Sequence, residues 1–266
     1  DRRQFVKNLG LGTASLSMGS LVTASSCAPS GDSSLKQNVK EGEDGQFLFI
    51  GDDIAIAQTE YGKVQGYLLN HVYTFLGVPY GADTSGKNRF MPPQKPEPWT
   101  DVRPAVFYGN TAPQRMENRW PNNYGTFADH WNYWDVSEDC LYLNVWTPGI
   151  ADGKKRPVLV WLHGGGFTNG SGIEQDGYHG ENISREGDIV FCSINHRLGP
   201  IGFSDLSGVG GEAYKDSGNV GMLDIIAALR WVHDNIANFG GDPGNVTVMG
   251  PVSYTHLRAH ETPEHL

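Results

Sequence analysis

The chain has few cysteines, fewer basic than acidic residues, and no long apolar run. Its three cysteines, Cys27, Cys140 and Cys192, are too few for a disulfide scaffold and lack metal-site spacing. Lysine and arginine number 20 against 30 aspartates and glutamates, a net charge of −10, which argues against a nucleic-acid partner because such proteins present a basic surface. Residues 9–22 are too short and too polar for a spanning helix. The 266 residues suffice for one large domain or two small ones.

Residues 1–27 have the organisation of an export signal. A charged start with the paired Arg2 and Arg3 precedes the weakly apolar run, and the pair followed by Gln-Phe-Val-Lys resembles a bacterial twin-arginine signal. The alternative, an amphipathic N-terminal helix, is disfavoured by three glycines in this stretch. We therefore expect export to the bacterial periplasm or cell envelope.

Cys27 is a predicted lipid attachment site. It follows the small residues Ala24-Ser25-Ser26, as in a lipoprotein cleavage site, although Ala24 stands where leucine is usual. Residues 28–44 are polar, contain proline, glycine and serine, and are typical of a flexible tether. A lipid at Cys27 would tether the protein to a membrane; the alternative is an unmodified cysteine inside a discarded signal.

The segment Pro157–Phe167 organises the rest of the chain. An apolar run over 158–162 predicts a strand buried on both faces. It continues directly into His163 and three glycines, Gly164, Gly165 and Gly166, which let a ligand approach backbone N–H groups closely. This His-Gly-Gly-Gly pattern is the oxyanion-loop motif of lipases and esterases, with His163 expected to shape the loop. The alternative is a glycine-rich turn without chemistry.

The pattern along the chain predicts an α/β fold. Strand-like runs cover 47–58, 62–69 and 72–76, and a further buried strand covers 189–194. Apolar residues at helical spacing from 222 to 239 predict a long helix, which Gly240-Gly241 ends before a strand at 246–249. The buried face is expected to consist of Met222, Ile225, Ile226, Leu229, Val232, Ile236 and Phe239. This order predicts a mostly parallel central sheet with an N-terminal antiparallel region.

Several segments resemble the type-B carboxylesterases, which have the α/β-hydrolase fold and include cholinesterases and bacterial broad-specificity esterases. They are Tyr73–Tyr80, Arg89–Trp99, Ser137–Val145 and Asn195–Phe203, and the third is similar to a family signature almost residue for residue. The resemblance implies that 45–250 form the N-terminal half of such a domain, a truncated α/β-hydrolase fold. It also implies an oxyanion hole made by the N–H groups of Gly165 and Gly166, with Gly164 supporting the turn.

Charged residues within these segments are expected to be structural. We predict that Glu138 and Asp139 form buried ion pairs with arginines such as Arg89, and that Arg197 meets one of these two carboxylates. His196 stands where the family has tyrosine and is interpreted as a hydrogen-bonded structural residue.

The sequence departs from the family pattern at one cysteine. The family's counterpart of Cys140 usually pairs with an upstream cysteine, and the corresponding position here is Ala112. Cys192 lies within an apolar strand. We therefore predict no disulfide and two buried free thiols.

A second departure follows Gly250, where the family continues with the nucleophile elbow Gly-x-Ser-x-Gly. The serine position is Val252, and Ser253 stands one place late without the second glycine, so the sequence predicts no nucleophile here. The order of the triad places all its members at or beyond this position. Residues 251–266 resemble a translated sequencing adapter and are expected to be a non-native tail, so their histidines and glutamates are not interpreted as a metal site. No cofactor is expected.

These observations predict that the parent protein is a serine esterase acting on a small-molecule carboxylic ester, and that the 266 residues alone are inactive. The alternative is a non-catalytic, cholinesterase-like binding or adhesion protein on the same fold. A third interpretation, the hormone-sensitive-lipase-like branch, is disfavoured by the signature Ser137–Val145.

Overall fold

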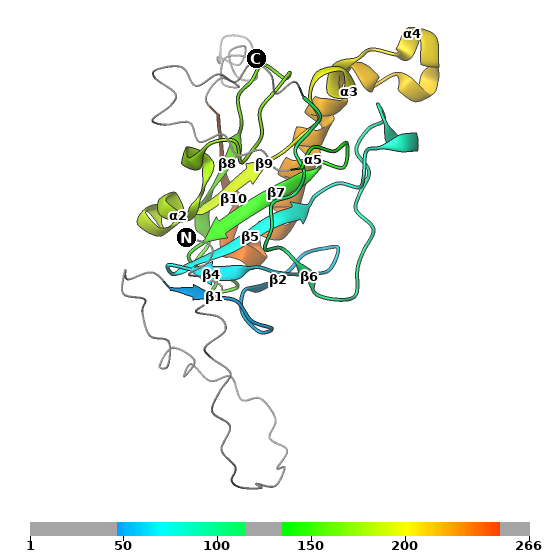
Figure 1. Ribbon diagram of the computed structural model, residues 1–266. Coiled ribbons are helices and arrows are strands. Elements are labelled where there is room, and N and C mark those ends of the chain that lie inside the picture. Colours follow the sequence, from blue (N-terminus) through cyan, green and yellow to red (C-terminus); the bar gives the residue numbers. More distant parts are fainter. Residues whose placement is uncertain (1–46, 115–134, 251–266) are drawn as a thin grey trace, which may run out of the picture. The chain divides into compact units, whose positions relative to one another are not determined.

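The computed structural model describes residues 47–114 and 135–250. Their main element is a seven-stranded sheet in the order β1-β4-β5-β7-β9-β8-β10 (Figure 1). Its strands are β1 (Leu48–Phe49), β4 (Tyr67–Leu69), β5 (Val72–Pro79), β7 (Tyr142–Thr147), β8 (Arg156–Leu162), β9 (Val190–Ile194) and β10 (Gly241–Met249). A smaller sheet combines β2 (Ile56–Gln58), β3 (Lys63–Gln65) and β6 (Arg103–Pro104).

The large sheet is mixed, which confirms the α/β class. Strands β9, β8 and β10 pair in parallel, whereas β1, β4, β5, β7 and β9 pair successively in antiparallel fashion. The sequence predicted a mostly parallel sheet with an antiparallel N-terminal region; in the described residues the antiparallel region is the larger part. The antiparallel region is larger because it extends past the N-terminal strands: β7 pairs in antiparallel fashion with β5 on one side and with β9 on the other.

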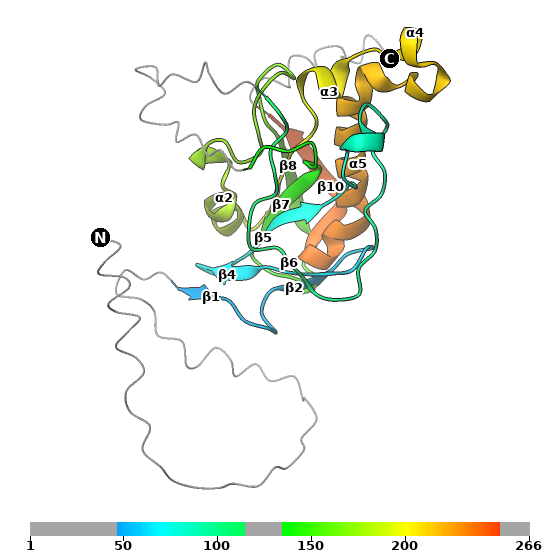
Figure 2. The same cartoon turned by 45° about the vertical axis from the view of Figure 1, so that its right-hand side comes forward.

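Two crossover connections cover opposite faces of the sheet. The chain passes from β8 through α2 (Glu181–Gly187) to β9 on one side, then from β9 through α5 (Val220–Asn235) to β10 on the other side of β8. Crossovers between parallel strands are right-handed. The connection from β8 to β9 runs one way along the sheet and the connection from β9 to β10 runs the other way, so the two helices lie on opposite faces. Figure 2 shows α2 and α5 on the two sides of the sheet.

Successive side chains of the central strands point to opposite faces of the sheet, and each face has its own apolar cluster. Val158 and Val160 of β8 join the larger core beneath α5, while Leu159 and Trp161 pack against a smaller cluster of Val72, Leu76, Trp146 and Phe191. All five residues of β9 are buried, as expected for a strand covered on both faces.

The predicted buried face of this helical segment is largely confirmed. Ile225, Val232, Ile236 and Phe239 are buried, and Met222 and Leu229 pack against the core, whereas Ile226 is 43% exposed. The helix also buries two polar residues that the apolar pattern did not indicate, Asp224 and Asn235.

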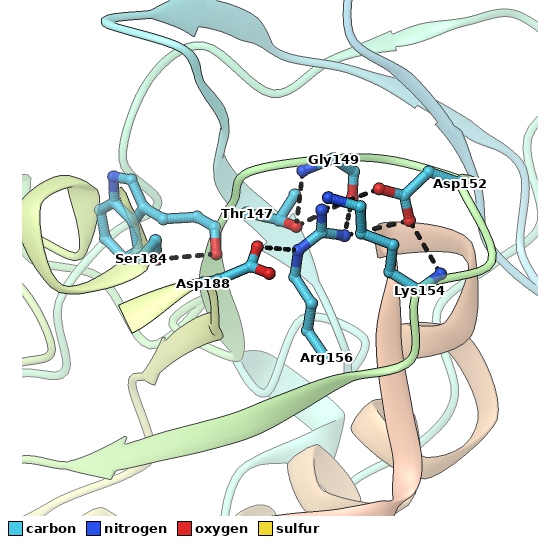
Figure 3. A network of polar contacts seen from close by, with 8 residues as sticks. Thr147, Gly149, Asp152, Lys154, Arg156, Ser184 and Asp188 are labelled. Carbon is cyan, nitrogen blue, oxygen red and sulfur yellow. Dashed lines mark hydrogen bonds and ion pairs between the residues drawn. The ribbon is translucent and has the colours of Figure 1, made fainter. Parts of the chain in front are cut away.

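Arg156 forms a network of polar contacts at the edge of the sheet where β8 begins, opposite the edge that carries the glycine loop (Figure 3). Its guanidinium, 3% exposed, forms two hydrogen bonds to Asp152, of 2.8 and 3.0 Å, and one of 2.6 Å to Asp188. The Arg156 backbone N–H donates to the carbonyl of Gly240, 2.9 Å away. One residue thus joins the starts of β8, β9 and β10.

Short helices fill the connections, and no helix in the described ranges is long and apolar enough to cross a membrane. They are the α-helices α3 (Gly199–Phe203) and α4 (Ser207–Gly210), with 3-10 turns at Gly86–Asn88, Asp176–Tyr178, Glu212–Tyr214, Ser217–Asn219 and Ile236–Phe239.

Candidate active site

Three parallel strands end side by side at one edge of the sheet. Leu162 pairs with Ile194, and Trp161 pairs with Met249, so β8, β9 and β10 finish level with one another. The central strand of the three, β8, leads into the glycine loop. Ligands of open α/β sheets bind beyond the carboxyl ends of such strands. The register therefore places the loop where the fold offers a site.

Hydrogen bonds to one carbonyl orient the peptide between Gly165 and Gly166. The Gly165 carbonyl accepts from the backbone N–H groups of Thr168, at 3.1 Å, and Asn169, at 3.3 Å, and from the Thr168 hydroxyl at 2.9 Å. In a trans peptide the N–H lies opposite the C=O. The N–H of Gly166 is thus turned away from these donors, and Gly166 is exposed.

The preceding peptide is oriented in the same way. The Gly164 carbonyl lies 2.8 Å from Nδ1 of His163, which directs the N–H of Gly165 to the other side. Within 47–114 and 135–250 neither Gly165 nor Gly166 uses its N–H in a hydrogen bond. Among the described residues, two adjacent N–H groups are thus left available to a hydrogen-bond acceptor.

Both residues have the positive φ angles that favour glycine, but for different reasons. Gly165 has φ +112°, and a Cβ there would collide with the Asn169 carbonyl, so only glycine fits. Gly166 has φ +62° and open space around its Cα.

Two buried histidine rings stack beneath the loop. The rings of His163 and His196 are 4.8 Å apart between centroids and nearly parallel, at 8°. His196 Nδ1 lies 2.9 Å from the Arg197 carbonyl, and burial lowers its pKa from 6.5 to about 4. His196 is therefore neutral at pH 7 and hydrogen-bonded, as interpreted from the sequence.

The predicted partner of Arg197 was wrong. Its Nε and Nη2 bond the Asp224 carboxylate at 2.8 and 2.6 Å, and the Arg197 backbone N–H adds a bond of 3.1 Å. A buried carboxylate on a helix needs a cationic partner, and Asp224 was not recognised as buried.

The signature carboxylates lie elsewhere. Glu138 pairs with Arg89 at 2.8 Å, as predicted, but the Arg89 side chain is 47% exposed, so this pair is not buried. Asp139 accepts a hydrogen bond of 2.8 Å from the Tyr142 hydroxyl rather than from an arginine. Both residues lie before the start of β7 and are only partly buried.

Two side-chain amides that the sequence analysis missed hold the far end of the loop. Asn195 accepts from the Gly172 N–H at 2.7 Å, and Gln114 forms two hydrogen bonds with the Gly170 backbone, both 2.8 Å. Asn195 could have been suspected from its position directly after a buried strand. No sequence signal distinguished Gln114, which lies in an irregular segment.

The thiols of Cys140 and Cys192 are buried and free, which agrees with the sequence. Burial raises the pKa of both, so neither is a reactive thiolate. The described ranges contain no cluster of three or more side chains suited to a metal. Cys27, Val252, Ser253 and the ranges 1–44 and 251–266 lie outside the described residues, so their predictions stand untested.

Comparisons with known proteins identify a family and sequence relatives. The model of the carboxylesterase family matches residues 53–253. The chain is 43% identical over 198 residues to para-nitrobenzyl esterase of Bacillus subtilis (strain 168), covering 73% of this chain and 37% of that protein. It is 45% identical over 195 residues to phenmedipham hydrolase of Pseudarthrobacter oxydans, with the same coverage.

A solved structure agrees. Carboxylesterase EST55 of Geobacillus stearothermophilus superposes with a TM-score of 0.65 at 42% identity, over 74% of this chain and 37% of that one. The chain thus spans little more than a third of the length of these relatives. The fold is that of the α/β-hydrolases, and the chain belongs to the carboxylesterase family.

Proposed function

We propose that the full-length protein hydrolyses small-molecule carboxylic esters through a serine acyl-enzyme. The observation that carries this proposal is that the N–H groups of Gly165 and Gly166, at the carboxyl end of β8, form no hydrogen bond within the part of the chain that the structure describes. The carbonyls of Gly164 and Gly165 are held by hydrogen bonds, so the N–H groups on the other side of the two peptides are oriented before a substrate binds. Preorganised donors of this kind stabilise a tetrahedral oxyanion far more than a flexible loop would.

In this mechanism a serine attacks the ester carbonyl, a histidine transfers its proton and an acid orients that histidine. The N–H groups of Gly165 and Gly166 hold the oxyanion, Gly164 supports the turn, and a third N–H comes from the residue after the nucleophile. Strand β10 ends at Met249, level with the end of β8 that leads into the loop. Because Val252 stands at the serine position, we propose that the 266 residues alone are inactive.

The test begins with the genomic sequence after Gly250. A Gly-x-Ser-x-Gly there is expected, and the full-length protein should hydrolyse p-nitrophenyl esters and react with a fluorophosphonate probe. Replacing that serine by alanine should abolish both. An authentic Pro251-Val252-Ser253 followed by a stop codon would refute the assignment.

A non-catalytic binding protein is the second candidate, and it would be favoured if Val252 proved to be the native residue at the nucleophile position. The glycine loop disfavours it, because a binding module has no need of oriented, unbonded N–H groups. A genomic sequence with an intact loop and no serine would decide for this candidate.

We also propose that the protein is exported and carries a lipid on Cys27. The paired arginines and the small residues before Cys27 support this. Mass spectrometry of the mature N-terminus tests it, since a mature chain that begins at another residue would exclude the lipid anchor.

A further inference from the structure

Gln114 and Gly170 form a closed pair of hydrogen bonds. Gln114 Nε2 donates to the Gly170 carbonyl, and the Gly170 N–H donates to Gln114 Oε1, each over 2.8 Å. The two residues are 56 positions apart, so the contact joins two separate segments. Because both donor and acceptor of one amide are used, the Gly170 backbone is fixed in orientation as well as in position.

The clamped residue lies against the entrance of the glycine loop. Gly170 has φ +112°, and a Cβ there would collide with the Gly164 carbonyl and with Nδ1 of His163. Those are the two groups that together direct the Gly165 N–H. The exit of the loop is therefore packed directly on the peptide that carries one predicted oxyanion donor.

Gln114 itself belongs to a well-anchored segment. The Thr111 N–H donates to the Asp135 carbonyl at 2.9 Å, and the Ser137 N–H donates to the Thr111 carbonyl at 3.0 Å. Gln114 Nε2 also lies 3.1 Å from the Ala112 carbonyl. The clamp thus ties the loop to a backbone segment that is held independently of it.

We propose that Gln114 is a positioning residue for ester hydrolysis: its amide holds Gly170 against the Gly164–Gly165 peptide and so keeps the oxyanion donors aimed. This inference rests on the proposed function. It assigns Gln114 no contact with the substrate, and its effect on the reaction passes through the loop.

The first test uses the chain without any substrate. Gln114→Met is similar in size but removes both hydrogen bonds to Gly170, together with the one to the Ala112 carbonyl. In this variant, amide hydrogen exchange at Thr168 and Asn169 should accelerate about tenfold, because their bonds to the Gly165 carbonyl loosen. Gln94→Met is the matched control: Gln94 is exposed and its amide donates only to the nearby Pro92 carbonyl. Unchanged exchange at both loop amides in a folded Gln114→Met chain would overturn the proposal.

The second test uses the full-length protein. Gln114→Met should lower kcat about 10- to 100-fold with KM nearly unchanged, because the donors stabilise the transition state rather than the bound ester. Gln94→Met should match the parent. An active parent whose kcat is unaffected by Gln114→Met would overturn the inference while leaving the proposed function intact, whereas a parent inactive on all esters would refute the function itself.

Gln114→Glu provides a readout that a purely structural role would not change. The ionised carboxylate keeps the acceptor for the Gly170 N–H but faces the Gly170 carbonyl without a donor; the protonated acid restores that donor. The ratio of the variant's kcat to that of the parent should therefore rise as the pH falls through the pKa of the introduced carboxyl group. A pH-independent ratio would count against the clamp.

Discussion

Arg197 and Asp224 form a fully buried, two-point ion pair between the carboxyl end of β9 and the first turns of α5. The two side chains are 1% and 0% exposed, and the Arg197 Nη1 also donates to the Met91 carbonyl at 2.8 Å. This pair joins the loop after β9, which carries His196, to the helix that covers the larger core.

Asp224→Asn should destabilise the protein strongly. The change leaves the Arg197 guanidinium buried without a counter-charge, which costs about 3–5 kcal/mol in comparable sites. Urea unfolding followed by circular dichroism measures the loss. Glu212→Gln, which removes an exposed ion pair with Lys215, is the control and should leave the midpoint unchanged. Equal midpoints for both variants would contradict the importance of the buried pair.

Sequence patterns predicted the parts of the fold that depend on local periodicity. The apolar run before the glycines marked β8, and helical spacing marked α5, because burial imposes these periods directly. The inward-facing side of α5 was partly mispredicted, since Asp224 is buried only because Arg197 meets it from 27 positions away. The role of Gln114 was not predicted for a similar reason: its partner, Gly170, lies in another loop, and no local sequence pattern indicates that contact.

The two candidate oxyanion donors should differ in their tolerance of alanine. Gly165→Ala forces a Cβ into the Asn169 carbonyl at φ +112° and should destabilise the chain by about 1–3 kcal/mol. Gly166→Ala meets open space and carries only the left-handed penalty, about 1 kcal/mol. Denaturant unfolding of the two variants compares them.

In the full-length protein both changes should lower kcat, Gly165→Ala the more severely, because it must move the peptide that carries a donor. If Gly165→Ala were as stable and as active as Gly166→Ala, the loop conformation described above would be incorrect.

Arg156→Met should loosen the edge of the sheet opposite the site. Its guanidinium is buried, but Asp188 is 62% exposed and Asp152 is partly exposed, so solvent compensates part of the loss and we expect about 2 kcal/mol of destabilisation. Arg185→Met, which removes a more exposed arginine paired with Glu181, is the control and should change the unfolding midpoint little. A larger effect in Arg185→Met than in Arg156→Met would contradict the role of the network in Figure 3.

The buried His196 should make the protein less stable in acid. Its pKa in the folded chain is about 4, against 6.5 for an exposed histidine, so between these values only the unfolded chain binds the proton. The free energy of unfolding contributed by this group is fully retained above pH 6.5 and falls by about 3 kcal/mol as the pH is lowered to 4. In His196→Phe, which keeps a ring beside His163 but cannot titrate, the dependence on pH in this window should be shallower by that amount. Urea unfolding at half-unit intervals from about pH 4 to pH 7 measures both slopes, and parallel curves for the parent and the variant would show that His196 is not the group responsible.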